Sequence, residues 1–190
     1  MKPLSLAIAA SLSLATFAQA DTTKAAMQDY LQSSISAWAH DPVLVAAIIE
    51  QNAQTSGFDQ AAIDQQDQLW RAFVGSDDAT IIADVVNNPA ADFLRNQVGQ
   101  SGGAITEAFI VDAKGLNVAA SEPTSDYWQG DEAKFTETYL MGPYAVHLGD
   151  VELDDSTQAV QGQVSMTIID TETGEPIGAL TVGLNVAALM

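Results

Sequence analysis

The amino-terminal half of the chain carries apolar residues at helical spacing. Apolar side chains recur three or four positions apart, with polar residues between them, which is the pattern of a helix that buries one face. The first such stripe consists of Met27, Leu31, Ile35 and Trp38. It predicts an amphipathic helix that packs on a core along one side.

Short polar residues that commonly cap helices precede the segments that follow. Their side-chain oxygens accept hydrogen bonds from the first backbone N–H groups of a helix, and a proline directly after them favours a helix start. These expected caps are Asp41, Asp59 and Asn88, and a further helix is expected to begin at Ser76-Asp77-Asp78. Glycines that interrupt the pattern are expected to end helices. We therefore predict a helical part that extends to residue 100.

From Ile105 onward the period changes to two, which is typical of strands. Two hairpins are predicted, each with a glycine-containing turn: 108–111 with 116–120, and 160–169 with 177–186. Along 160–168, apolar side chains at even positions alternate with polar ones at odd positions, so the sheet has an apolar and a polar face. Helices followed by an antiparallel sheet define an α+β domain, with long N-terminal helices packed on one face of the sheet.

Composition narrows the classes of function. The 190 residues include 25 acidic and 6 basic side chains, for a net charge of −19, and no cysteine. Nucleic acid and anionic membrane surfaces are poor partners for so acidic a chain, because both attract clustered cations. The absence of cysteine excludes disulfides, thiolate metal sites and cysteine nucleophiles.

The first 20 residues are typical of a secretory signal. Lys2 is followed by an apolar stretch, 4–17, and by Ala18-Gln19-Ala20 as a cleavage site. An uncleaved anchor is the alternative, but about 14 apolar residues are short of the roughly 20 that span a bilayer. We expect cleavage before Asp21, a periplasmic or secreted protein, and one domain over 21–190, with a helical part (21–100) and a sheet part (105–190).

The stretch between the two hairpins is rich in aromatic residues. Five of the chain's 13 aromatic residues fall within 127–144, after the polar run 123–126. Aromatic walls with a few polar groups are typical of small-ligand pockets. The alternative is a loop that its aromatic side chains hold against the sheet.

The candidate ligand-binding residues come from this loop and from the polar sheet face. Two aspartates beside aromatic rings suit an ammonium or another small polar group, through charge and cation–π attraction. Alternatively, both aspartates are solvated residues of an acidic surface. The candidates are Asp126, Tyr127, Trp128, Asp131, Tyr139 and Tyr144, with Gln163 and Ser165 on the strand.

Metal binding and catalysis are weaker hypotheses. The acidic run 150–155 lacks the spaced aspartates of a calcium loop, and His40 and His147 have no closely spaced ligand partner. No nucleophile elbow, zinc-protease motif, phosphate loop or dinucleotide fingerprint occurs. We predict no cofactor, metal or catalytic residue. A hydrolase that uses Asp126 and Asp131 and a structural or partner-binding protein remain as alternatives.

The sheet part resembles the extracytoplasmic Cache sensor domain, a PAS-like (PDC) fold. The resemblance rests on Val111-Asp112-x-x-Gly115, the 124–132 loop, the strand 161–170 and Ile177-Gly178-Ala179-Leu180. It implies a small molecule bound between the polar face of the sheet and the loops and helix over it. The chain lacks the Arg-x-Trp-Tyr segment of amino-acid-binding members and the Arg/His cluster of dicarboxylate binders.

The predicted function is therefore a stand-alone sensor domain that binds a small polar ligand, with an amine as one candidate. Because the sequence stops at Met190, shortly after the last strand, we expect signalling through a separate periplasmic receptor or transporter component. The charge of the chain favours a basic docking surface on that partner. The alternative is a scavenging or buffering binder with no signalling output.

Overall fold

A computed structural model describes residues 22–76, 80–153 and 160–190. The predicted signal segment, the predicted start of a helix at 77–78 and part of the acidic run therefore lie outside the described residues. The helical part begins with a helix over 22–33 and the short turn η1 (Ile35–Ala37). It continues with α2 (Pro42–Thr55), α3 (Gln60–Phe73), α4 (Thr80–Val86) and α5 (Pro89–Gln100).

The three helix caps predicted from the sequence are confirmed. The side chain of Asp41 accepts a hydrogen bond from Val43 N–H at 2.9 Å. Asp59 and Asn88 do the same for the N–H groups of Ala62 and Ala91, also at 2.9 Å. Within the described residues, no helix combines the length and apolar character needed to cross a membrane.

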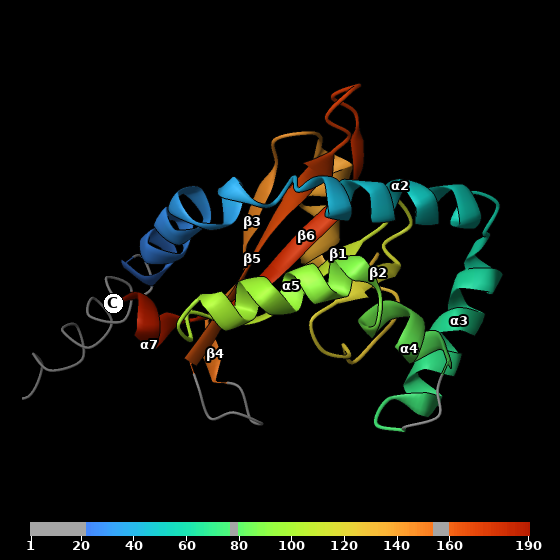
Figure 1. Cartoon of the computed structure of the whole chain (residues 1–190), viewed down its shortest axis with the longest axis horizontal. Coiled ribbons are helices and arrows are strands. Elements are labelled where there is room, and N and C mark those ends of the chain that lie inside the picture. The colour runs from blue at the N-terminus through green and yellow to red at the C-terminus, as the bar shows by residue number, and fades with distance from the viewer. Residues whose placement is uncertain (1–21, 77–79, 154–159) are drawn as a thin grey trace, which may run out of the picture.

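The strands form one antiparallel sheet behind α2 and α5 (Figure 1). Its strands are β1 (Ile105–Val111), β2 (Asn117–Ala120), β3 (Val146–Leu148), β4 (Glu152–Leu153), β5 (Val160–Ile169) and β6 (Pro176–Asn185). The order is β2-β1-β6-β5-β3, and β4 also pairs with β5. Both predicted hairpins are present, and the α+β class with an antiparallel sheet is confirmed. The short helix α7 (Val186–Leu189) follows β6.

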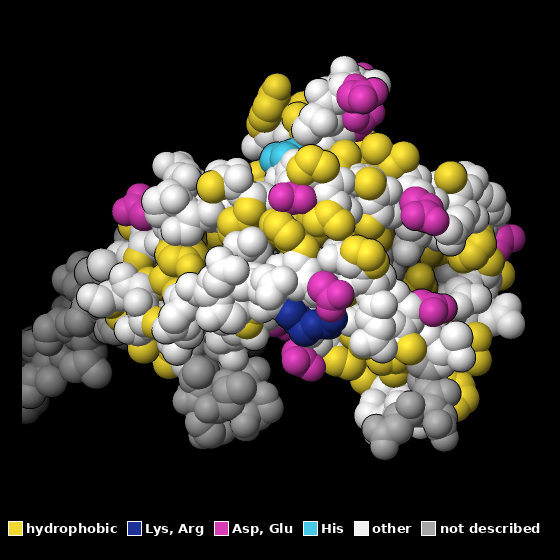
Figure 2. All heavy atoms as spheres, in the orientation of Figure 1, with side chains coloured by type: hydrophobic (Ala, Val, Ile, Leu, Met, Phe, Trp, Pro, Cys, Tyr) yellow, Lys and Arg dark blue, Asp and Glu magenta, His cyan; other side chains and the backbone are white. Residues whose placement is uncertain are grey.

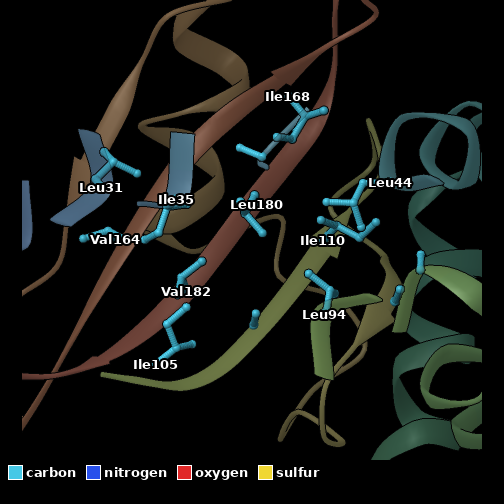
Figure 3. Close-up of a cluster of buried hydrophobic side chains, with 14 of the residues drawn as sticks. Leu31, Ile35, Leu44, Leu94, Ile105, Ile110, Val164, Ile168, Leu180 and Val182 are labelled. Carbon is cyan, nitrogen blue, oxygen red and sulfur yellow. The ribbon is translucent and has the colours of Figure 1, made fainter. Parts of the chain in front are cut away.

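The main core lies between the helices and the apolar face of the sheet (Figure 3). Leu31 and Ile35 from the N-terminal segment, Leu44 from α2 and Leu94 from α5 meet the even-numbered side chains of β5 and β6. Met27, Leu31 and Ile35 are almost fully buried, as their helical spacing predicts.

A second core covers part of the opposite face of the sheet. Phe109 and Val111 of β1 pack there against Trp70 of α3 and Phe135 of α6 (Ala133–Thr136). The neighbouring turn η2 (Tyr139–Met141) follows α6. The predicted polar face is thus not open along its length. Ser165 and Thr167 of β5 are each 1% exposed, because this second layer covers them.

Candidate functional site

The aromatic loop follows the turn that joins β1 and β2. Trp128 forms a bridge with Leu116, and its indole N–H donates to the carbonyl of Lys114 at 2.9 Å. Gly115 has φ +79°, and a Cβ atom there would lie 2.5 Å from the Cα of Gly130. Turn and loop are therefore in direct backbone contact, and neither position has room for a side chain.

Helix α3 holds the beginning of this loop through Asp67. One carboxylate oxygen of Asp67 accepts the backbone N–H groups of Tyr127 (3.0 Å) and Trp128 (3.1 Å). The other oxygen pairs with Arg71 at 2.7 Å, and Arg71 also pairs with Asp126 at 3.1 Å. Asp67 is only 8% exposed, so its charge is stabilised by these donors rather than by water.

Aromatic packing reinforces the same attachment. The rings of Trp70 and Tyr127 stack with centroids 5.5 Å apart, and the Trp70 indole N–H donates to Thr124 O at 2.8 Å. Burial raises the pKa of the Tyr127 phenol, and the carboxylates of Asp112 and Asp84 raise it further. A neutral phenol within a hydrophobic layer is a structural element of the second core.

A groove of ≈ 950 Å³ lies beside this layer on the same face of the sheet. Strands β1, β3 and β5 contribute to it, and the segment around α6 forms one side. Its polar lining consists of Lys24, Glu107, Glu132, Lys134, Glu137, His147, Asp150, Gln161 and Gln163, and its apolar lining of Ala133, Val146 and Leu148. Charged groups of both signs therefore surround a space large enough for a small molecule.

The floor of the groove is a row of residues across three strands. Glu107 of β1 and Gln163 of β5 are both register partners of Gly183 on β6. The Gln163 amide donates across this glycine to Glu107 Oε1 at 3.1 Å. A Cβ atom at residue 183 would lie 2.7 Å from Glu107 Cγ and 3.1 Å from Oε1. The missing side chain of Gly183 thus provides the space that the Glu107 carboxylate occupies.

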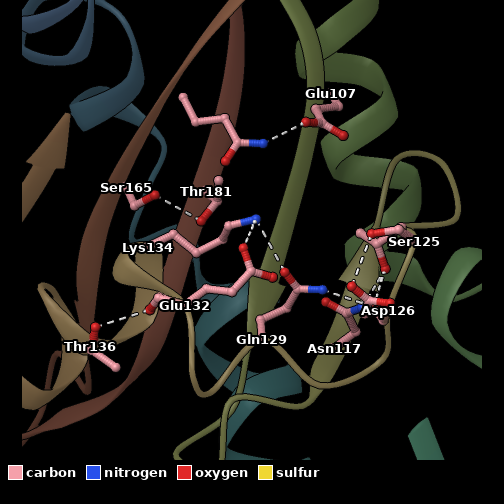
Figure 4. A network of polar contacts seen from close by, with 12 residues as sticks. Glu107, Asn117, Ser125, Asp126, Gln129, Glu132, Lys134, Thr136, Ser165 and Thr181 are labelled. Carbon is pink, nitrogen blue, oxygen red and sulfur yellow. Dashed lines mark hydrogen bonds and ion pairs between the residues drawn. The ribbon is translucent and has the colours of Figure 1, made fainter. Parts of the chain in front are cut away.

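Lys134 of α6 lines one side of the groove, and Figure 4 shows its polar contacts. Its ammonium donates to Gln129 Oε1 at 3.2 Å and pairs with Glu132 at 3.0 Å. It also lies 5.4 Å from the centroid of the Phe109 ring. The Lys134 side chain is 16% exposed, so its position is fixed by these contacts.

One further ion pair and one histidine–glutamate contact line the groove. Lys24 pairs with Asp150 at 3.1 Å, and His147 Nδ1 lies 2.8 Å from Glu137 Oε2. The described residues contain no group of three or more histidine, aspartate or glutamate side chains that could hold a metal ion. Asp154 and Asp155 of the acidic run lie outside the described residues.

The predicted site residues fall into separate places. Gln163 lines the groove, and Ser165 lies below it, bonded to Thr181 at 2.9 Å. Asp126, Tyr127 and Trp128 are engaged by α3 and by the β1–β2 turn. Tyr139 stacks on Phe135 with centroids 5.1 Å apart, Asp131 is exposed, and Tyr144 is 87% exposed beside a small apolar pocket next to β3.

Neither Glu107 nor Lys134 was among the candidate residues predicted from the sequence. A glutamate inside the apolar strand 105–111 is the signal that could have identified Glu107, because charged residues are rare in such strands unless they have a partner or a function. Lys24 and Asp150 lie far apart in sequence, and only the fold brings them together.

No protein-family model matches the chain, and no curated protein matches it. Solved structures similar to it include the sensor domain of the V. cholerae histidine kinase DctB, at 15% identity and a TM-score of 0.48, over 94% of this chain and 58% of that one. The ligand-binding domain of the Campylobacter jejuni chemoreceptor Tlp3 in complex with L-norvaline has 13% identity and a TM-score of 0.44, over 94% and 62%.

The ligand-binding domain of the Pseudomonas aeruginosa PAO1 amino acid chemoreceptor PctC in complex with GABA has 11% identity and a TM-score of 0.42, over 92% of this chain and 61% of that one. The chain thus spans less than two thirds of the length of each of these three structures. All three are sensor or ligand-binding domains.

Proposed function

We propose that this chain is a sensor domain that binds a small polar molecule in the groove between the sheet and α6. The observation that carries the proposal is the groove itself, at ≈ 950 Å³ and lined by charged and amide side chains from three strands and α6. Polar groups that converge on a concave site can fix the orientation of a small molecule. The sensor and ligand-binding domains with a similar fold support the same class of function.

The groove is built from rigid parts. Its floor belongs to the hydrogen-bonded strands β1, β6 and β5, and Lys134 is fixed by Gln129 and Glu132. Polar groups that are already held in place lose little conformational entropy on binding, so they favour specific recognition of a small ligand.

We further propose that the domain acts in the periplasm or outside the cell and signals through a separate protein with a basic docking surface. Acidic side chains are spread over the face in Figure 2, where the basic colour forms one small patch near α5 between acidic neighbours. A net charge of −19 would steer such a domain toward a positive surface.

Thermal unfolding in the presence of a panel of small polar metabolites tests ligand binding. A ligand at 100 times its Kd should stabilise the native protein by about 2.7 kcal/mol. Gln163→Ala is expected to reduce this stabilisation, whereas Gln65→Ala, an exposed change of the same kind on α3, should leave it intact. If no compound stabilises the native protein more than it stabilises Gln163→Ala, the groove is not a binding site and the proposal fails.

A further inference from the structure

One carboxylate of the groove lies on the sheet floor and contacts neither a lysine, an arginine nor a histidine among the described residues. Asp150 is paired with Lys24, Glu132 with Lys134, and Glu137 contacts the His147 ring. Glu107 is different: among the described residues it has no ion pair, and its carboxylate accepts a hydrogen bond from the neutral amide of Gln163. The floor of the groove therefore carries an uncompensated negative charge.

The position of Glu107 directs this charge toward the groove. Its carboxylate lies over Gly183 in the middle of the sheet and lines the groove together with Gln161 and Gln163. The Gln163 amide donates to one oxygen, Oε1, which fixes the orientation of the carboxylate and leaves further lone pairs for another donor. An ionised carboxylate in a polar recess is most favourably completed by a cationic donor.

The other charges in the groove argue against an anionic ligand. Both lysines of the lining already have carboxylate partners, so an anion would have to displace Asp150 or Glu132 before it could pair with either of them. An anion would also approach a chain with a net charge of −19. A cation needs to displace neither carboxylate, and the negative charge of the chain attracts it.

We infer that the ligand carries an ammonium or guanidinium group that pairs with Glu107. The inference rests on the proposed function of the groove and names the chemical class of its ligand. The remaining lining is made of amide groups, Gln161 and Gln163, and of the short apolar surface of Ala133, Val146 and Leu148. This lining suits a short carbon chain with a second polar group such as a hydroxyl.

Three probes of equal chain length separate the possibilities: 4-aminobutan-1-ol, 4-hydroxybutyrate and butane-1,4-diol. Their binding to the full chain is measured by chemical-shift titration in two-dimensional NMR at constant ionic strength. The amine is expected to bind at least tenfold more tightly than the carboxylate or the diol, because only the amine forms a charge-assisted hydrogen bond with Glu107. Glu107→Gln should raise the Kd of the amine about tenfold.

A matched control is needed because an acidic protein attracts amines non-specifically. Glu122→Gln removes the same charge at an exposed position outside the groove lining and should leave the Kd of the amine unchanged. Equal losses in Glu107→Gln and Glu122→Gln would overturn the assignment.

The outcomes distinguish this inference from the proposed function. If 4-hydroxybutyrate or the diol binds more tightly than the amine, and Gln163→Ala abolishes that binding, the inference of a cationic ligand is wrong but the groove is still a binding site. Shift changes confined to residues outside the groove for all three probes would count against the groove itself.

Discussion

Asp67 should be among the residues of α3 that matter most for stability, although it is charged. Its carboxylate accepts two backbone N–H groups of the aromatic loop and pairs with Arg71, and it is 8% exposed. Asp67→Ala leaves the N–H groups of Tyr127 and Trp128 without their acceptor. Hydrogen bonds to a charged group contribute about 1.5–3 kcal/mol each.

We expect Asp67→Ala to lower the free energy of unfolding by about 3 kcal/mol, which takes both hydrogen bonds at the low end of that range. The Arg71 pair adds little, since Arg71 is more than half exposed and keeps Asp126 as a partner. Asp67→Asn retains an oxygen that can accept hydrogen bonds and should cost about 1 kcal/mol.

Urea unfolding followed by far-UV circular dichroism measures these differences. Asp64→Ala is the matched control, because Asp64 is exposed on the same helix and bonds only to Gln60 among the described residues. It should change the free energy of unfolding by less than about 0.5 kcal/mol. If Asp67→Ala is as mild as Asp64→Ala, α3 does not hold the loop in the way described.

Three further predictions concern the loop, the turn and the effect of pH. Trp128→Ala should lower the free energy of unfolding by about 2 kcal/mol, because the Trp128 indole bonds to the turn. Asp131→Ala, at an exposed position, should change it by less than about 0.5 kcal/mol. Titrating ligand into both variants at a temperature where both are folded then shows whether either side chain contacts the ligand. Gly115→Ala should cost at least about 2 kcal/mol in chemical unfolding, since it combines a positive φ with a clash against Gly130, and a near-neutral result would refute that close approach. Burial lowers the pKa of His40 from 6.5, and its buried Nε2 has no hydrogen-bond partner in the described part of the chain. The unfolded state therefore takes up the proton at a higher pH than the folded state does. As a result, the free energy of unfolding falls as the pH drops below 6.5 toward the folded pKa. His40→Gln should lose less stability than the native protein between pH 7 and 5 in urea titrations, and equal losses would exclude this contribution.

Local patterns in the sequence predicted the elements of the fold well. The caps Asp41, Asp59 and Asn88 and the two hairpins depend on neighbours within a few residues, so short-range spacing identifies them. The apolar stripe of the first helix also predicted which side chains enter the main core.

The candidate site was less accessible to such reasoning, because it depends on contacts between distant segments. Asp126 was considered as a ligand contact, but Arg71, which compensates it, is placed by the packing of α3 and cannot be identified from the loop sequence. The alternation along β5 places Ser165 on the polar face, as predicted, but its burial depends on the second layer over the sheet. The space above Gly183 could likewise be predicted only by knowing which residues of β1 and β5 pair with Gly183.

The arrangement of strands below the groove has a consequence for folding kinetics. β5 and β6 form a local hairpin, as do β1 and β2, but the pairing of β1 with β6 joins Val111 to Ala179 and Ile105 to Leu184. Such non-local strand pairing closes a long loop and is intrinsically slow. Glu107 and Gln163 lie on opposite sides of β6, so they meet across Gly183 only after this pairing forms. Any folding intermediate that contains just the two hairpins would lack the floor of the groove, and binding at the groove would therefore appear only after β1 has paired with β6.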